Sequence, residues 1–213
     1  MSAGLDPDRT LALAYLPDGV RPAIEALWRL DATMAAILAT GTQPLITQMR
    51  LAWWREALER LDIAPPPAEP VLLALATYVL PTVSGAELAA MEEGWLQLLS
   101  EEALGEGELA RYAALRGGLL FQFSARLLGD TGFPVERAGE SWALADLARH
   151  SRRKDESKLP VPESKTRWPK NLRPLGMLVM LARRDLERFG KKPERLGNPL
   201  RILRMIWHRV SGY

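Results

Sequence analysis

The side chains best suited to hold a charged ligand form one short basic cluster, RHSRRK, at residues 149–154. The cluster contains four cations, which are Arg149, Arg152, Arg153 and Lys154. Together they could hold a phosphate or an acidic lipid head group without a metal, through charge-assisted hydrogen bonds. The alternative is a solvated helix end, whose cations suit the negative end of the helix dipole.

Other reactive side chains are sparse. The chain of 213 residues has no cysteine, which excludes a disulfide framework, a thiolate metal site and a cysteine nucleophile, and fits a reducing compartment. Of its two histidines, His150 has no second His or Cys at metal-ligand spacing, so we expect it to be a surface or cap residue. The sequence therefore predicts no metal site of the histidine or cysteine type.

The net charge of +2 conceals two regions of opposite sign. From Arg149 to the end there are 18 Lys and Arg against 6 Asp and Glu, which leaves 10 of the 28 basic and 20 of the 26 acidic residues for the rest. One interpretation is an anionic partner for the basic part, such as a membrane surface, a phosphate-bearing ligand or an acidic protein. The other is mutual attraction of the two regions within one fold. Nucleic acid is not an expected partner, because no binding motif accompanies the basic residues.

Apolar residues recur at helical spacing almost everywhere, so the sequence predicts an all-α chain that forms a single domain over residues 1–213. The third predicted helix opens at Pro44 and carries Ile46, Met49, Trp53 and Ala57 on one face. We expect helices over residues 9–16, 20–40, 44 to the proline-rich break at 64–70, 71–80, 84–99, 105–129, 135–153, 175–189 and 199–210.

The last predicted helix is basic and amphipathic. It has one apolar side surrounded by arginines, with Leu200, Leu203, Ile206, Trp207 and Val210 on that side and Arg201, Arg204 and Arg209 around it. Such a helix can lie in a membrane interface, or it can be the last helix packed on a bundle. No window offers about 20 apolar residues for a membrane span, and the N-terminus reads as neither a secretory nor a transit peptide. We expect a cytoplasmic protein, with the inner membrane face as a peripheral site.

Residues 21–58, RPAIEALWRLDATMAAILATGTQPLITQMRLAWWREAL, resemble the second and third helices of the squalene/phytoene synthase family. The shared features are the Arg-(Arg/Pro)-Ala start, an aromatic at Trp28 and the closing Trp-Trp-Arg-(Asp/Glu)-x-Leu. Later, AGESWALADLARHSRRKD is similar to the family's second metal helix, and KLPVP to the turn that follows it. The resemblance implies an all-α isoprenoid synthase bundle, here shortened at its C-terminal end, whose enzymes join two prenyl diphosphates head to head.

The resemblance also shows what has changed. The family's enzymes hold Mg²⁺ through Asp-rich motifs on two facing helices, because Mg²⁺ prefers carboxylate oxygens. In this chain the acidic positions of the first motif fall on Ala35, Ala36 and Ala39, and those of the second on His150, Arg153 and Lys154. The resemblance therefore implies no metal site and no cofactor, with Mg²⁺ expected only if catalysis remains.

Two acids remain near the altered motifs, Asp31 one turn before Ala35 and Asp146 on the second metal helix. They could face the cavity as a pair, or each could be a buried carboxylate satisfied by an arginine, with Arg29 and Arg149 as candidates. The expected ligand-binding residues outside the basic cluster are Trp28, Trp54 and Gly117. Close helix packing is the alternative explanation of Gly117.

The sequence is most similar to the branch of the family with weakened Asp motifs, which includes the mitochondrial complex I assembly factor. The similarity implies a catalytically degraded protein that binds a prenyl or lipid ligand, or a protein partner, at the membrane surface. The alternative is an active, Mg²⁺-dependent prenyltransferase acting on farnesyl or geranylgeranyl diphosphate.

Overall fold

The computed structural model describes residues 4–99, 104–150, 166–188 and 194–213, and these residues form helices without any strand. The predicted all-α class is confirmed. The α-helices are α1 (Pro7–Ala14), α2 (Arg21–Thr40), α3 (Pro44–Arg60), α4 (Pro70–Tyr78), α5 (Gly85–Leu96), α6 (Glu106–Tyr112), α7 (Leu119–Leu127), α8 (Glu136–His150), α9 (Arg173–Glu187) and α10 (Pro199–Ser211). A short 3₁₀ helix, η1 (Gln97–Leu99), follows α5, and a π-helical segment, η2 (Ala113–Gly118), joins α6 to α7.

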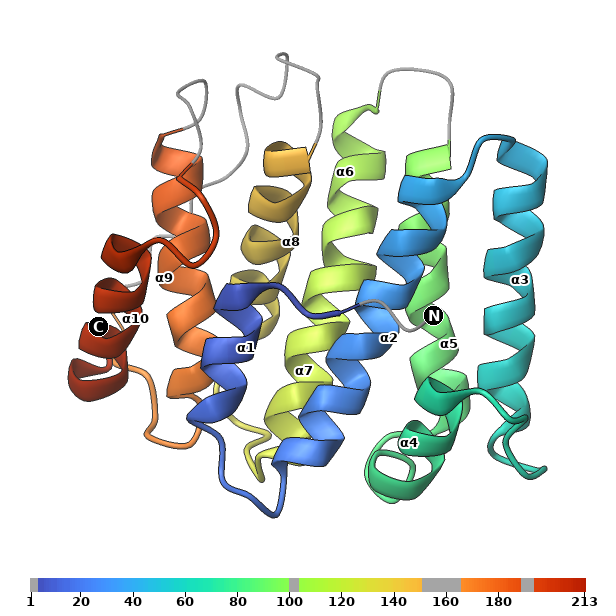
Figure 1. Cartoon of the computed structure of the whole chain (residues 1–213), viewed down its shortest axis with the longest axis horizontal. Helices are drawn as coiled ribbons and strands as arrows, with labels where there is room; N and C mark the ends of the chain where they lie inside the picture. Colours follow the sequence, from blue (N-terminus) through green and yellow to red (C-terminus); the bar gives the residue numbers. More distant parts are fainter. Residues whose placement is uncertain (1–3, 100–103, 151–165, 189–193) are drawn as a thin grey trace.

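The helices lie side by side, with α3 at one edge of the molecule and α10 at the opposite edge (Figure 1). Helix α8 packs between η2 and α9, α3 packs on α5, and α10 packs on α9. Segments far apart in the sequence thereby meet in the middle of the bundle, where α1, α2, η2, α8 and α9 lie close together.

Local sequence accounts for where several helices begin. Proline occupies the first turn of α1, α2, α3, α4, α9 and α10, where its missing N–H leaves no hydrogen bond unmade. At α5 the Ser84 hydroxyl accepts from the Glu87 N–H at 3.2 Å, and the Glu87 carboxylate accepts from the Ser84 N–H at 2.9 Å. This is a capping box, as the sequence predicts.

The helix predicted over residues 105–129 is interrupted by the π-helical turn η2 at its centre. Such turns shift the register of a helix and often occur at functional sites. Here the turn brings Gly117 so close to α8 that a Cβ would lie 2.1 Å from the carbonyl oxygen of Gly139. The chain therefore needs glycine at this position for the two helices to pack.

Helix α3 turns a different face inward from the one its apolar pattern suggests. Of the predicted face only Ala57 is buried, whereas Ile46, Met49 and Trp53 are exposed. The side that packs against α5 consists of Thr47, Leu51, Trp54, Ala57 and Leu58. Periodicity locates a stripe along a helix, but the neighbouring helices decide which side of the helix is buried.

Candidate functional site

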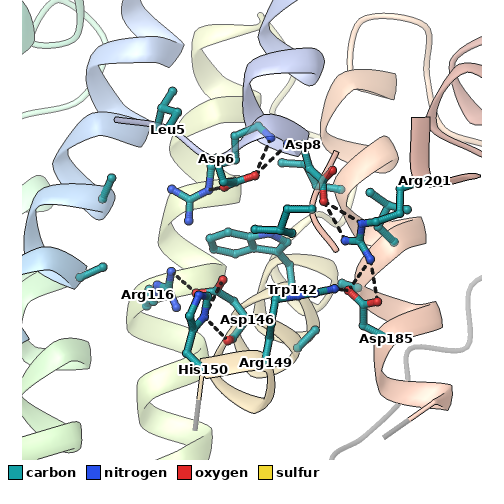
Figure 2. A pocket seen from close by; sticks show the side chains of 18 of the residues that line it. Leu5, Asp6, Asp8, Arg116, Trp142, Asp146, Arg149, His150, Asp185 and Arg201 are labelled. Atoms are coloured by element: carbon teal, nitrogen blue, oxygen red, sulfur yellow. Dashed lines mark hydrogen bonds and ion pairs between the residues drawn. The ribbon is translucent and has the colours of Figure 1, made fainter. Parts of the chain in front are cut away.

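A cavity of about 220 Å³ opens where α1, α2, η2, α8, α9 and α10 converge. The indole ring of Trp142 lies in its wall, and charged side chains gather on both sides of that ring (Figure 2). On one side are Arg116 and Asp146, and on the other Asp8, Arg201 and Asp185. The wall of the cavity therefore combines charged side chains with apolar surface, which is contributed by residues such as Leu5, Ala35 and Leu178.

Asp31 of α2 is fully buried and accepts hydrogen bonds from two arginines. Its Oδ1 accepts from Nε of Arg116 at 2.8 Å. Its Oδ2 accepts from Nη2 of Arg9 at 2.8 Å and from Nη2 of Arg116 at 3.1 Å. Both oxygens are thus occupied by guanidinium donors, and the carboxylate lies behind the cavity wall, beneath the arginines that line it.

Arg116 connects Asp31 to the second acid. Its Nη2 lies 2.7 Å from Oδ2 of Asp146 on α8, and its Nη1 donates to the Tyr112 hydroxyl. The guanidinium carbon also lies 4.2 Å from the centre of the Trp95 ring and 4.9 Å from that of Trp142. A single buried cation therefore bridges α2 and α8, the two helices on which the sequence places the altered Asp-rich motifs.

The arginines keep both acids ionised, although Asp31 is fully buried and Asp146 is half-buried. Burial alone would raise the pKa of Asp31, but the guanidinium groups of Arg116 and Arg9 outweigh this effect and hold the pKa below its usual value. The same balance lowers the pKa of Asp146, with Arg116 again the leading opposing charge. Burial opposes the charge of Arg116 in turn, yet Asp31 and the other nearby groups raise its pKa well above the usual value.

A second charged cluster joins the ends of the chain to the bundle. Arg201 of α10 donates from Nε to Asp8 of α1 at 2.9 Å and from Nη1 to Asp185 of α9 at 2.7 Å. Arg149 of α8 donates to the same Asp185 at 2.5 Å. The pair of Asp8 and Arg201 links the acidic and basic parts of the sequence, which supports the interpretation that the two parts attract each other within one fold.

The residues present do not fit Mg²⁺. This ion takes about six oxygen ligands and usually one or two carboxylates with room for water. Asp31 does not line the cavity and both of its oxygens accept from arginines, and Asp146 is bound to Arg116. Across the described ranges, no group of three or more His, Cys, Asp or Glu side chains could hold a metal ion. Ala35 lines the cavity without any ligand atom, and Ala36 and Ala39 lie further along the same helix.

The structure assigns different partners to Asp31 from those the sequence suggests. Asp31 is a buried carboxylate paired with arginines, as one interpretation of the sequence expects, but the arginines are Arg9 and Arg116. Arg29 instead pairs with Glu25 on its own helix, and Arg149 pairs with Asp185. Helix geometry explains the error, because residues two apart on α2 point in different directions.

The remaining predicted site residues lie in varied places. His150 is exposed, and its Nδ1 lies 2.8 Å from the backbone oxygen of Asp146. Trp28 and Trp54 are buried in the core, where the Trp28 Nε1 donates to the Ser124 hydroxyl at 3.2 Å, and neither ring lines the cavity. Their ligand-binding role, like that of Gly117, stays a prediction. Arg152, Arg153 and Lys154 lie outside the described residues.

Five charged residues of the site are not predicted from the sequence: Asp8, Arg9, Arg116, Asp185 and Arg201. Arg116 did carry a signal, because it is a lone cation followed by two glycines in the apolar stretch YAALRGGLLF. A charged residue is rarely buried unless it is paired, so an arginine in such a stretch implies a buried carboxylate elsewhere. The partner itself cannot be read from the pattern, since Asp31 is 85 residues away.

These features define a class: an all-α bundle whose central cavity lies between two helices bridged by charged side chains. The squalene/phytoene synthase family model matches residues 3–162, and the chain belongs to this family. No curated protein and no solved structure gives a significant match. Among the described helices, none is long and apolar enough to cross a membrane.

Proposed function

We propose that this member of the family has lost metal-dependent prenyl transfer and acts by binding, as an assembly-factor-like protein at the surface of a membrane. The observation that carries the proposal is the position of Arg116 between Asp31 and Asp146. The acids that remain near the altered motifs are already neutralised by a permanent cation. A metal ion would have to approach that cation, and like charges about 4 Å apart repel by roughly 4 kcal/mol at an effective dielectric of 20.

The size and lining of the cavity support the same proposal. Pockets for drug-sized ligands usually measure about 300 to 1,000 Å³ and are mostly apolar. This cavity measures about 220 Å³, and arginines and aspartates share its wall with the apolar side chains. Two prenyl diphosphates with their long apolar chains do not suit such a space. A prenyl or lipid ligand, or a protein partner, is therefore expected to meet the outside of the bundle, with the protein peripheral to the cytoplasmic face of its membrane.

The second candidate is an active prenyltransferase that condenses two prenyl diphosphates. The observation that favours it is Asp146, a carboxylate that does line the cavity next to the bound Asp31. For this function Arg116 would have to leave both acids before Mg²⁺ could bind, which the buried and fully paired guanidinium makes costly.

A turnover assay separates the two candidates. Purified protein is incubated with farnesyl or geranylgeranyl diphosphate, with and without Mg²⁺, and the products are analysed by chromatography. We expect no product and no Mg²⁺-dependent change in the unfolding temperature. Turnover that requires Mg²⁺ and is abolished by Asp146→Asn, but not by Asp185→Asn on the other side of Trp142, would establish the enzyme instead.

A further inference from the structure

Helix α10 exposes the apolar side of its surface. Leu203 is 62% exposed, Trp207 69% and Val210 69%. Leu200, Ile206 and Tyr213 extend the same surface. We call these six residues the α10 apolar face. Monomeric proteins rarely expose a contiguous apolar patch of this kind without a function for it.

The inner side of α10 explains why the apolar face is free. Arg201, Met205 and His208 are the buried residues of the helix, and Arg201 is fixed by Asp8 and Asp185. The helix therefore packs on α9 through the ion pair of Arg201 with Asp185 and through the buried side chains beside it. It lies at the edge of the molecule (Figure 1). The helix packs on the bundle, as one interpretation of the sequence expects, but its apolar side is not the side that packs.

Cations border the α10 apolar face. Arg204 and Arg209 lie on its two flanks, between the buried and the exposed sides of the helix, as their spacing requires. Arg167 reaches the C-terminal end, where its Nε donates to the Ser211 carbonyl at 3.0 Å and its guanidinium lies 6.0 Å from the centre of the Tyr213 ring. Residues 194–213 contain four arginines and one glutamate; of these, Arg201 is buried against Asp8 and Asp185, and Arg204 pairs with Glu194 at 2.7 Å.

This combination matches the surface of a membrane that contains anionic lipid. An interfacial helix buries leucine and tryptophan at the boundary of the acyl chains, while flanking arginines meet the lipid head groups. Tryptophan and tyrosine prefer that boundary, because their rings are apolar and their polar atoms stay hydrated. A second copy of the chain suits the face less well, since two-fold pairing would bring the same cations together.

We propose that the α10 apolar face inserts into the interface of an anionic membrane and is the surface by which this protein binds it. The proposal rests on the proposed action at a membrane surface and names the face that makes the contact. In this arrangement α10, at the edge of the molecule, lies along the membrane surface, with Arg204, Arg209 and Arg167 at head-group level.

The test compares two exposed apolar surfaces on the same protein. One variant carries Leu203→Glu and Trp207→Glu on α10. The matched control carries Met49→Glu and Trp53→Glu on α3, where the side chains are 65% and 47% exposed and arginines are offset by Glu56 and Glu59. The four side chains are 47% to 69% exposed, so both variants are expected to keep the wild-type circular dichroism spectrum. Trp53 also packs edge-on against Trp54, so the unfolding temperature of the control should fall slightly.

Binding is measured by co-sedimentation with vesicles of phosphatidylcholine alone and of phosphatidylcholine mixed with phosphatidylglycerol. The wild type should bind the mixed vesicles, less strongly as salt is added, because salt screens the arginines. The α10 variant should lose about tenfold or more in affinity, whereas the α3 control should bind like the wild type.

Three results would overturn the proposal. Equal binding by the wild type and the α10 variant would leave a membrane-binding protein whose contact lies elsewhere. A wild type that binds neither kind of vesicle would remove the proposed membrane role together with this face. A wild-type dimer in light scattering that the α10 variant dissociates would assign the face to a second copy. Turnover of prenyl diphosphates would contradict the proposed loss of catalysis but not this contact.

Discussion

The charged cavity and the α10 apolar face both reverse the usual distribution of side chains. At the cavity, Arg116 in the wall and Asp31 behind it are almost fully buried, whereas on α10 Leu203 and Trp207 are mostly exposed. The difference lies in their partners. Each buried charge is met by opposite charges from other helices, but the described part of the chain provides no cover for the apolar face. The buried charges are thus paired within the chain, whereas the exposed apolar face is expected to contact a partner outside it.

The largest effect is expected when the buried charges lose their shared cation. Arg116→Leu leaves Asp31 with Arg9 alone and Asp146 without its closest guanidinium. Removing one partner of a buried ion pair costs about 3 to 5 kcal/mol, because the remaining charge is desolvated without compensation. The free energy of unfolding, measured by urea titration, should fall by this amount.

The control for Arg116 is Arg111→Ala on α6, which removes an exposed arginine paired with Glu93. Exposed pairs contribute about 0 to 1 kcal/mol, so this variant should remain close to the wild type. Equal losses in the two variants would mean that the buried bridge contributes no more than a surface pair, and the contrast between the cavity and the surface would disappear.

A second effect should appear at low pH. The lowered pKa of Asp31 means that its ionised form stabilises the folded state at neutral pH, and that this stabilisation is lost as the pH falls below about 4. Asp31→Asn should cost roughly 2 to 3 kcal/mol at neutral pH, since hydrogen bonds to charged groups are lost. The loss should diminish in acid, where the wild type is also protonated.

The measurement for Asp31 is the free energy of unfolding of both proteins from neutral to acid pH. Asp18→Asn, at an exposed carboxylate, controls for the removal of one negative charge. Parallel wild-type and Asp31→Asn curves would show that this carboxylate does not depend on its arginines for its charge.

A smaller effect is expected from the packing that places Arg116. Gly117→Ala should destabilise the protein by about 1 to 3 kcal/mol, because the new methyl group would overlap the Gly139 backbone and force η2 and α8 apart. The neighbouring Gly118→Ala is the matched control, since its nearest atom lies 3.8 Å from the position of the Cβ. If both alanines are tolerated equally, close packing does not explain the glycine at 117.

Helical periodicity predicts most of the fold, because most helices bury one apolar stripe. The start of α5 follows from a local hydrogen-bonding motif, Ser84 with Glu87, and is also readable in advance. Which side of α3 and of α10 is buried cannot be read from the sequence in advance. In both, the apolar stripe is correctly located but lies outside, because the contacts of Trp54 and Arg201 with other helices decide the orientation.

The site is less predictable than the fold, since its interactions join distant parts of the chain. Resemblance to the family draws attention to Asp31 and Asp146, and both belong to the charged site. The arginines that bind them lie on other helices, and nothing local distinguishes Arg116 from the exposed Arg111 except its glycine and apolar neighbours.

The smallest predicted effect concerns the inner side of α10, directly behind its apolar face. His208 is buried against Trp168 and Gly176, and burial, with Arg173 nearby, lowers its pKa. Below about pH 6.5 this imidazole therefore binds a proton in the unfolded chain but stays neutral in the folded one. The free energy of unfolding should decrease as the pH is lowered through that range. The slope should stay below about 1.4 kcal/mol per pH unit, the limit for one group.

His208→Gln should flatten this part of the pH profile, and Trp207→Gln on the exposed side should leave it unchanged. In the vesicle assay the same pair should behave in the opposite way at neutral pH: Trp207→Gln weakens binding, and His208→Gln does not. A loss of vesicle binding in His208→Gln with the unfolding temperature retained would mean that the inner side of α10 also meets the membrane. In that case the helix would have to leave α9 in order to bind, and the apolar face alone would not be the contact.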